Sequence, residues 1–283
     1  MRVHRWKTLA GFALFAFRAF AGTLFERLRG AYGVAAFNRL IPFAALLFPS
    51  CPALAEPQAA LCATAEKSVQ ADLWLASEVA AVFGKAKFVG KESDCLYPLM
   101  ALRYASADLL LVQTGEPGEG CHGCGAALSA YVIQRVNGGL RPVRKFREFA
   151  EIGTNGSIME AWPIQIAGDD ALAIQGGGTF QGHTSSAIFF FVFRAGLIVD
   201  LGPNPPVTLD ADNSGAMDDQ SQAIAVTGSW FFDPSDKSSL VVDYKIDAKG
   251  ATRVERVVWR VQGGKLVLSK GQVPQEVTDA RGG

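Results

Sequence analysis

The chain has 283 residues, 49% of them apolar, which is enough to bury the core of one large domain or of two small ones. Its formal net charge is zero, but the first 55 residues hold seven of the 27 Lys and Arg residues and one of the 27 Asp and Glu residues, so residues 56–283 carry a net charge of −6. An acidic body without a basic stripe excludes nucleic acid as the expected partner, because phosphate binding needs concentrated positive charge.

Residues 1–55 have the pattern of a targeting segment. Arg39 precedes the apolar run 40–48, and Ala53-Leu54-Ala55 follows it. A positive region, a short apolar run and an A-x-A site together predict a signal peptide cleaved after Ala55. We therefore expect a periplasmic or secreted bacterial protein. The unusual length of the positive region would be explained by a start codon nearer Val34.

Two alternatives to cleavage stay open. Phe48-Pro49-Ser50-Cys51 resembles a lipid-attachment motif in which Cys51 would anchor the protein to a membrane, although Pro49 fits that motif poorly. An uncleaved membrane anchor is the other alternative, but the apolar runs at 9–25 and 40–48 fall short of the roughly 20 uninterrupted apolar residues that a span needs. We expect no transmembrane span after processing.

The mature chain begins with a helical pattern and continues with strand patterns. Apolar residues recur at about four-residue intervals between 59 and 83, which predicts one amphipathic helix that ends at Gly84. Short β-rich runs bounded by turn residues then follow at 99–104, 108–113, 131–136, 140–146, 164–166, 171–174, 187–193, 197–199, 223–232, 240–246, 253–261 and 265–268.

These runs predict a mainly β fold, built as an antiparallel sandwich, barrel or propeller-like meander after one N-terminal helix. We expect residues 56–283 to form a single domain. The Pro- and Asp-rich stretch 202–222 is expected to be a long loop, with a boundary between two β units as the alternative.

Cysteine number and spacing predict two disulfides. Cleavage after Ala55 would leave four cysteines, and an even number in an oxidising compartment favours disulfide bonds. The spacing favours the pairs Cys62–Cys95 and Cys121–Cys124, because the members of the second pair already lie close together.

The glycine-rich loop 120–125 allows three interpretations. The first is a disulfide that stiffens the loop. The second is a thiol–disulfide redox pair, but such pairs lie between a strand and a helix, whereas the residues after Cys124 have a strand pattern. The third is a zinc site of Cys121, Cys124 and His183, with His122 as an alternative ligand, although one Cys-x-x-Cys is a weak zinc signal. We favour the structural disulfide and leave the other two open.

A second glycine-rich stretch, 176–186, contains His183. It can expose backbone N–H groups to a ligand, but it lacks the Lys-Ser/Thr ending of a phosphate loop. A turn or a bulge between strands is the simpler interpretation. The sequence also has no G-x-S-x-G motif, and nothing in it pairs a nucleophile with a base, so we predict no catalytic residue.

An acidic stretch has the spacing of a calcium loop. Asp210, Asp212, Ser214 and Asp218 would supply oxygen ligands around the turn at Gly215. The twelfth position, however, is a serine and not the expected glutamate. A solvated acidic loop is therefore the simpler interpretation, with calcium binding as the alternative.

The order of these landmarks resembles a group of exported bacterial proteins of uncharacterised function. The landmarks are Cys-His-x-Cys, a Gly-Gly turn, Gly-x-Phe-x-Gly-x-Thr and Asp-Asn-Ser-Gly-Ala, and they cover about residues 108–250. The resemblance implies an envelope protein and assigns no catalytic role.

The sequence as a whole favours a binding or structural module of the bacterial envelope. Its partner would be an unknown envelope protein or small ligand, and we expect no cofactor, with calcium or zinc as the alternatives. A thiol–disulfide redox protein that uses Cys121 and Cys124, and a calcium-dependent β module, are the alternative functions.

Overall fold

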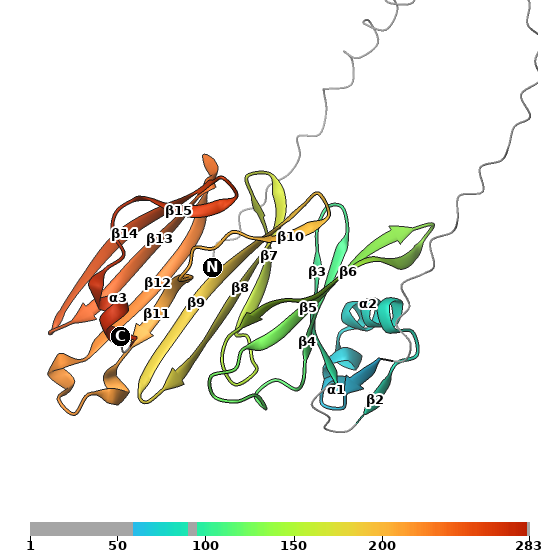
Figure 1. Ribbon diagram of the computed structural model, residues 1–283, viewed down its shortest axis with the longest axis horizontal. Coiled ribbons are helices and arrows are strands. Elements are labelled where there is room, and N and C mark those ends of the chain that lie inside the picture. The colour runs from blue at the N-terminus through green and yellow to red at the C-terminus, as the bar shows by residue number, and fades with distance from the viewer. Residues whose placement is uncertain (1–58, 90–94, 282–283) are drawn as a thin grey trace, which may run out of the picture. The chain divides into compact units, whose positions relative to one another are not determined.

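The structure is a computed structural model that describes residues 59–89 and 95–281. The predicted signal peptide, its cleavage site and the Cys51 alternative lie outside the described residues. Among the helices of the described part, none is long and apolar enough to cross a membrane. The prediction of a mainly β, antiparallel fold is confirmed: a curled sheet that forms a half-barrel lies beside a second sheet (Figure 1).

The smaller sheet has six strands in the order β2-β1-β3-β4-β5-β6. They are β1 (Ala60–Cys62), β2 (Lys87–Val89), β3 (Leu96–Arg103), β4 (Asp108–Thr114), β5 (Ala126–Val136) and β6 (Gly139–Ile152). The hairpin of β5 and β6 turns at Asn137 and Gly138, which both have positive φ as such a turn requires. Strands β3 to β6 are antiparallel, whereas β1 pairs in parallel with both β2 and β3.

The larger sheet has nine strands, and eight of them follow the order β15-β14-β13-β12-β11-β9-β8-β7 while β10 pairs with β9. They are β7 (Glu160–Ile166), β8 (Asp169–Phe180), β9 (His183–Arg194), β10 (Leu197–Asp200), β11 (Val207–Asp212), β12 (Ile224–Asp233), β13 (Asp236–Ala248), β14 (Ala251–Gln262) and β15 (Lys265–Lys270). Its curvature brings Trp162 of β7 and Trp230 of β12 edge to face, with ring centroids 5.8 Å apart.

Burial on both faces explains the continuous apolar runs in the central strands. Leu109 and Leu111 of β4 face the larger sheet, while Leu110 and Val112 face the helices. A strand that is covered on both faces needs apolar residues at every position, so it loses the usual alternation with polar residues. The layer between the two sheets also contains an edge-to-face pair of aromatic rings. A separate hydrophobic core fills the inside of the curled larger sheet.

The N-terminal helical region differs from the single helix expected at 59–83. The chain first forms β1 and then two helices, α1 (Ala65–Ala71) and α2 (Leu73–Phe83), which are separated at Asp72. The Asp72 carboxylate accepts hydrogen bonds from the backbone N–H groups of Trp74 and Leu75, so it caps α2 and starts a new helix. A third, unpredicted helix, α3 (Gln275–Ala280), has only six residues, too few to show a periodic pattern.

Residues 202–222 are not a loop throughout. Strand β11 lies inside this stretch and pairs with β9 on one side and with β12 on the other. Two short 3₁₀ turns, η1 (Ser214–Ala216) and η2 (Gln220–Gln222), follow it. The glycine-rich stretch 176–186 is likewise mostly strand, because β8 and β9 continue through it and turn only at Gln181 and Gly182.

Candidate functional site

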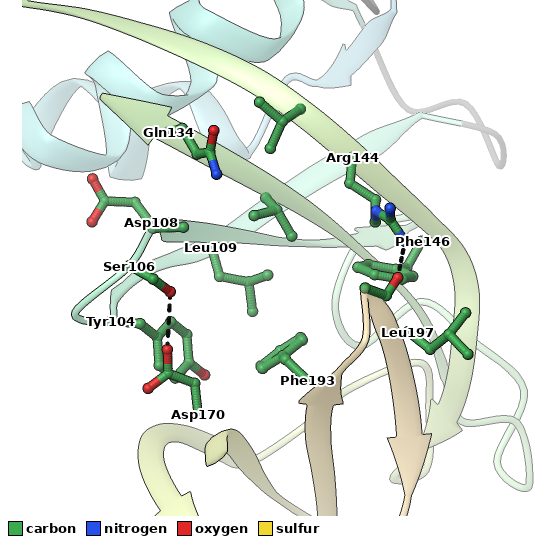
Figure 2. Close-up of a pocket in the computed structure, with 14 residues that line it drawn as sticks. Tyr104, Ser106, Asp108, Leu109, Gln134, Arg144, Phe146, Asp170, Phe193 and Leu197 are labelled. Carbon is green, nitrogen blue, oxygen red and sulfur yellow. Dashed lines mark hydrogen bonds between the residues drawn. The ribbon is translucent and has the colours of Figure 1, made fainter. Parts of the chain in front are cut away.

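A cleft opens between the two sheets, where the β3–β4 turn approaches the larger sheet (Figure 2). It has a volume of about 480 Å³, and we call it the inter-sheet cleft. Its walls are mainly apolar, and Leu109, Phe146 and Phe193 supply much of that surface. The described residues that line it include neither Cys nor His, and its mainly apolar walls equip it to bind a molecule.

Hydrogen bonds between the sheets fix one side of the cleft. The Tyr104 hydroxyl donates to the Ala171 carbonyl at 2.9 Å, and the Ser106 hydroxyl donates to the Asp170 carboxylate at 3.1 Å. The Tyr104 ring also meets Phe193 edge to face at a centroid distance of 5.5 Å. These contacts join the β3–β4 turn to β8 and β9 at a fixed separation.

The Arg144 side chain fixes the other side. Its guanidinium, on β6, donates to the Gly196 carbonyl in the turn between β9 and β10 (Figure 2). Gly196 has φ of 73°, and a Cβ there would lie 2.5 Å from the Arg144 Nη1 atom. The positive φ is the feature that favours glycine at this position, because the end of the Arg144 side chain can move away from a Cβ.

Charged groups surround the apolar part of the cleft. Burial raises the pKa of the Tyr104 hydroxyl, and the nearby Asp170 carboxylate raises it further, so Tyr104 stays protonated and keeps its hydrogen bond. Asp108 is 4% exposed, and its carboxylate pairs with Arg135 at 2.7 Å and with Arg103 at 3.4 Å. The cleft thus combines an apolar body with a few oriented polar groups.

Both predicted disulfide pairings are present in the structure. Cys62 in β1 bonds to Cys95, directly before β3, and both residues are fully buried. Cys121 bonds to Cys124 in the exposed loop between β4 and β5. The first bond ties the N-terminal strand to the sheet, and the second closes a short surface loop.

The surroundings of Cys121 and Cys124 are those of a stapled loop. Strand β5 follows the loop, so no helix N-terminus is available there to stabilise a thiolate. Backbone hydrogen bonds join the loop to the 153–157 turn, from Gly156 N to the Cys124 carbonyl at 2.9 Å and from Gly120 N to the Asn155 carbonyl at 3.2 Å. A redox role for this pair stays a hypothesis that a potential measurement can test.

The structure does not bring together the three residues of the predicted zinc set. Among the described residues, the only group of three His, Cys, Asp or Glu ligand atoms within 4.8 Å of one another is Cys62, Cys95 and Glu116. Both cysteines of that group are disulfide-bonded, so neither offers a thiolate to a metal. His183 and the Cys121–Cys124 loop do not form such a group.

The residues with calcium-loop spacing are engaged in local hydrogen bonds. Asp210 accepts from the Ser186 hydroxyl at 2.6 Å, and Asp212 accepts from the backbone N–H of Ser214 at 2.6 Å. Asp210 and Asp212 belong to strand β11, whereas Asp218 lies beyond η1. Because the first two ligands sit in an extended strand, the segment does not have the continuous loop that wraps a calcium ion.

Close backbone packing accounts for the glycines of 176–178. The turn that contains Thr154 lies against this part of β8, and the Thr154 hydroxyl donates to the Gly177 carbonyl at 2.9 Å. A Cβ on Gly178 would lie 1.8 Å from the Thr154 Oγ1 atom. These glycines allow two backbone segments to approach closely, which is a common role of glycine inside a strand.

The inter-sheet cleft was not predicted from the sequence. Tyr104, Arg144, Asp170 and Phe193 come from four separate strands or turns, and no short motif joins them. The local signal was limited to the turn residues around positions 105–107 and 168–170, which predicted turns without predicting that the turns would face each other.

Comparison with known protein families, curated proteins and solved structures finds no match to this chain. The resemblance to exported bacterial proteins therefore stays a prediction. The geometry of the described residues is what points to a function.

Proposed function

We propose that this chain is an exported, disulfide-stabilised binding module of the bacterial envelope, and that it binds a small molecule with an apolar body in the inter-sheet cleft. The observation that carries the proposal is the cleft itself, an apolar space of about 480 Å³ with a few polar groups at its edge. Small-molecule sites in proteins span roughly 300–1,000 Å³ and have the same division between an apolar lining and a few orienting polar groups.

The two disulfides support the exported part of the proposal. Disulfide bonds persist in oxidising compartments and are rare in the cytosol, where thiols are kept reduced. The buried Cys62–Cys95 bond and the exposed Cys121–Cys124 bond therefore agree with the signal-peptide pattern of residues 1–55. The mass of the exported protein, alkylated without reduction, would test both the cleavage after Ala55 and the absence of free thiols.

The lining suggests the chemistry of the ligand. Leu109, Phe146 and Phe193 offer aliphatic and ring-edge contacts to a flat apolar body. Gln134 and Asp170 at the edge offer hydrogen-bonding groups to a polar end. A ligand with one apolar part and one neutral or polar end would match both the apolar lining and the hydrogen-bonding groups at the edge.

The hydrogen bonds that join the two sheets favour binding by a preformed site. Tyr104 and Arg144 hold opposite sides of the cleft, so a ligand need not order these sides when it enters. A preformed site loses less conformational entropy on binding than a flexible one does.

A neutral apolar probe tests the cleft. We expect N-phenyl-naphthylamine to bind the full chain saturably in equilibrium dialysis. Val143 lines the cleft and is 37% exposed, so Val143→Trp should fill the cleft from its edge without disturbing the core. Val254 on β14 is 68% exposed and does not line the cleft, so Val254→Trp is the matched control.

Binding that is lost in Val143→Trp and kept in Val254→Trp would support the proposal. Absence of saturable binding to the wild-type chain, or equal binding by both variants, would overturn it. Thermal unfolding of both variants would establish that each is folded before binding is compared.

A further inference from the structure

A second recess lies where the 153–154 turn, β8, β9 and the end of α3 meet. It has a volume of about 530 Å³, and we call it the histidine groove. It is defined by six of its lining residues, which are His122, Thr154, His183, Ser185, Thr208 and Arg281. These residues come from parts of the chain that are far apart in sequence, and the fold alone gathers them.

The charge of this groove differs from that of the body around it. His122 and His183 are the two histidines of residues 56–283, and both line the groove although they are 61 positions apart. Arg281 adds a guanidinium, and no Asp or Glu occurs among the described residues that line it. The inter-sheet cleft, in contrast, is lined by Asp108 and Asp170. Residues 56–283 carry a net charge of −6, so a groove whose described lining residues include no carboxylate stands out as a place that favours an anion.

The hydrogen bond of His183 determines which ring nitrogen remains for a ligand. Its Nδ1 atom lies 2.9 Å from the carbonyl oxygen of Ala280 in α3. A carbonyl can only accept, so Nδ1 carries a hydrogen and donates it. Nε2 is then the ring nitrogen available to a ligand.

Arg281 also has donors to spare. One of its N–H groups donates to the Thr208 hydroxyl at 3.1 Å, which holds the side chain against β11. A guanidinium has five N–H donors, so this bond leaves others for a ligand. Thr208 is 5% exposed, and its position is fixed further because its own carbonyl accepts from the buried Tyr244 hydroxyl at 2.9 Å.

The Asp210 carboxylate, which contacts Ser186 of this groove, is already held by other groups. Asp210 accepts from the Ser186 hydroxyl at 2.6 Å and from the Gln175 amide at 3.4 Å. Ser186 lines the groove but Asp210 does not, so the serine lies between the carboxylate and the groove.

We infer that the histidine groove binds the oxyanion group, phosphate or carboxylate, of a small molecule. The remaining N–H groups of Arg281 would donate to the anion, and His183 would donate from Nε2 when its ring carries a second proton. His122 would add a second imidazole to the lining. Charge-assisted hydrogen bonds of this kind are about twice as strong as neutral ones, and guanidinium suits both phosphate and carboxylate.

The test uses the full chain with inorganic phosphate and with citrate as probes, titrated calorimetrically at constant ionic strength against chloride. We expect saturable binding of at least one of the two probes. Binding of phosphate alone would identify a phosphate-bearing ligand, and binding of citrate alone would identify a carboxylate-bearing one. His183→Gln and Arg281→Gln should each weaken binding by about tenfold or more, since the first removes the imidazole and the second removes the guanidinium.

The matched control is Lys270→Gln, because Lys270 is an exposed cation on β15 that does not line the groove. It should bind as the wild type does. Imidazole signals in the NMR spectrum of the wild-type chain give a second readout that does not depend on a variant folding, and the His183 signal, assigned through His183→Gln, should shift with the probe. No binding beyond that of chloride, an unshifted His183 signal, or equal weakening by Lys270→Gln would overturn the inference.

Discussion

The buried carboxyl pair of Glu78 and Asp108 allows a sharp prediction about pH. Glu78 of α2 is 0% exposed, and its pKa is raised above the usual value, first by burial and then by the hydrogen bond to Asp108 and the negative charge of Asp108. Opposing effects come from the Trp74 indole, which donates to Glu78 at 3.1 Å, and from Arg135 at 3.6 Å. The Oε2 atom of Glu78 has no hydrogen-bond partner among the described residues.

The sign of the pH dependence follows from the raised pKa. A carboxyl group that holds its proton more tightly in the folded state stabilises the fold fully below its unfolded pKa, and this stabilisation is lost as pH rises through the folded pKa. Glu78→Gln keeps the size of the side chain, can still accept from Trp74, and cannot ionise. Its free energy of unfolding should therefore match that of the wild type at about pH 4 and exceed it as the wild-type carboxyl ionises.

The size of the gain follows from the charge that the buried wild-type carboxylate carries at high pH, which glutamine does not carry. Leaving a buried polar group unsatisfied costs about 1–3 kcal/mol, and more when the group is charged. We expect Glu78→Gln to be more stable than the wild type by about 1–3 kcal/mol at about pH 9, and to lie within about 0.5 kcal/mol of it at about pH 4.

Urea unfolding of both proteins across this pH range measures the difference directly. Comparing the two proteins cancels the carboxylates whose pKa is lowered, such as Asp243 beside Arg256, because both proteins share them. Glu66→Gln in the neighbouring helix α1, where Glu66 is exposed, is the matched control and should leave the pH profile unchanged. A stability difference that does not vary with pH, or one that favours the wild type more as pH rises, would refute the reasoning.

Three further predictions concern the disulfides and the acidic segment. Replacing Cys62 and Cys95 by alanine should lower the free energy of unfolding by about 3–4 kcal/mol in urea, because their bond closes a loop of 33 residues; an unchanged midpoint would contradict this. The Cys121–Cys124 bond should have a reduction potential below about −300 mV in a glutathione titration, and a markedly higher potential would revive the redox hypothesis. Adding calcium or a chelator should leave the melting temperature unchanged, because Asp212 is engaged with the Ser214 backbone; a rise with calcium would show binding to the folded state.

Local patterns in the sequence predicted most of the strands but not their arrangement. The Asn137-Gly138 turn and the apolar run of β9 are encoded by neighbouring residues, so they are visible without a structure. The parallel pairing of β1 with β2 and β3, and the position of β11 between β9 and β12, depend on residues far apart in the chain. The break in the N-terminal helix was readable in principle, since Asp72 is a favoured capping residue, but the apolar periodicity continues across it and conceals it.

The inter-sheet cleft and the histidine groove were hidden for the same physical reason. A binding recess forms where separate segments meet, so its residues carry no common spacing. Arg144 and Gly196 form one contact although 52 positions separate them. The disulfide pairing of Cys121 and Cys124 could be predicted because the chain itself holds the two residues together, whereas no spacing could show that His122 and His183 line one groove.

The motifs that stood out in the sequence lie where separate backbone segments pack against one another. The Cys121–Cys124 loop is bonded to the 153–157 turn, and that turn lies against the glycines of β8. The turn after β8 also packs closely against the acidic segment. A Cβ on Gly182 would lie 2.4 Å from the carbonyl carbon of Gly215. Glycine is needed on both sides of such a contact, since any side chain would separate the two backbones. Three apparently independent motifs are thus parts of one packed assembly, and both His122 and His183 line the groove beside it.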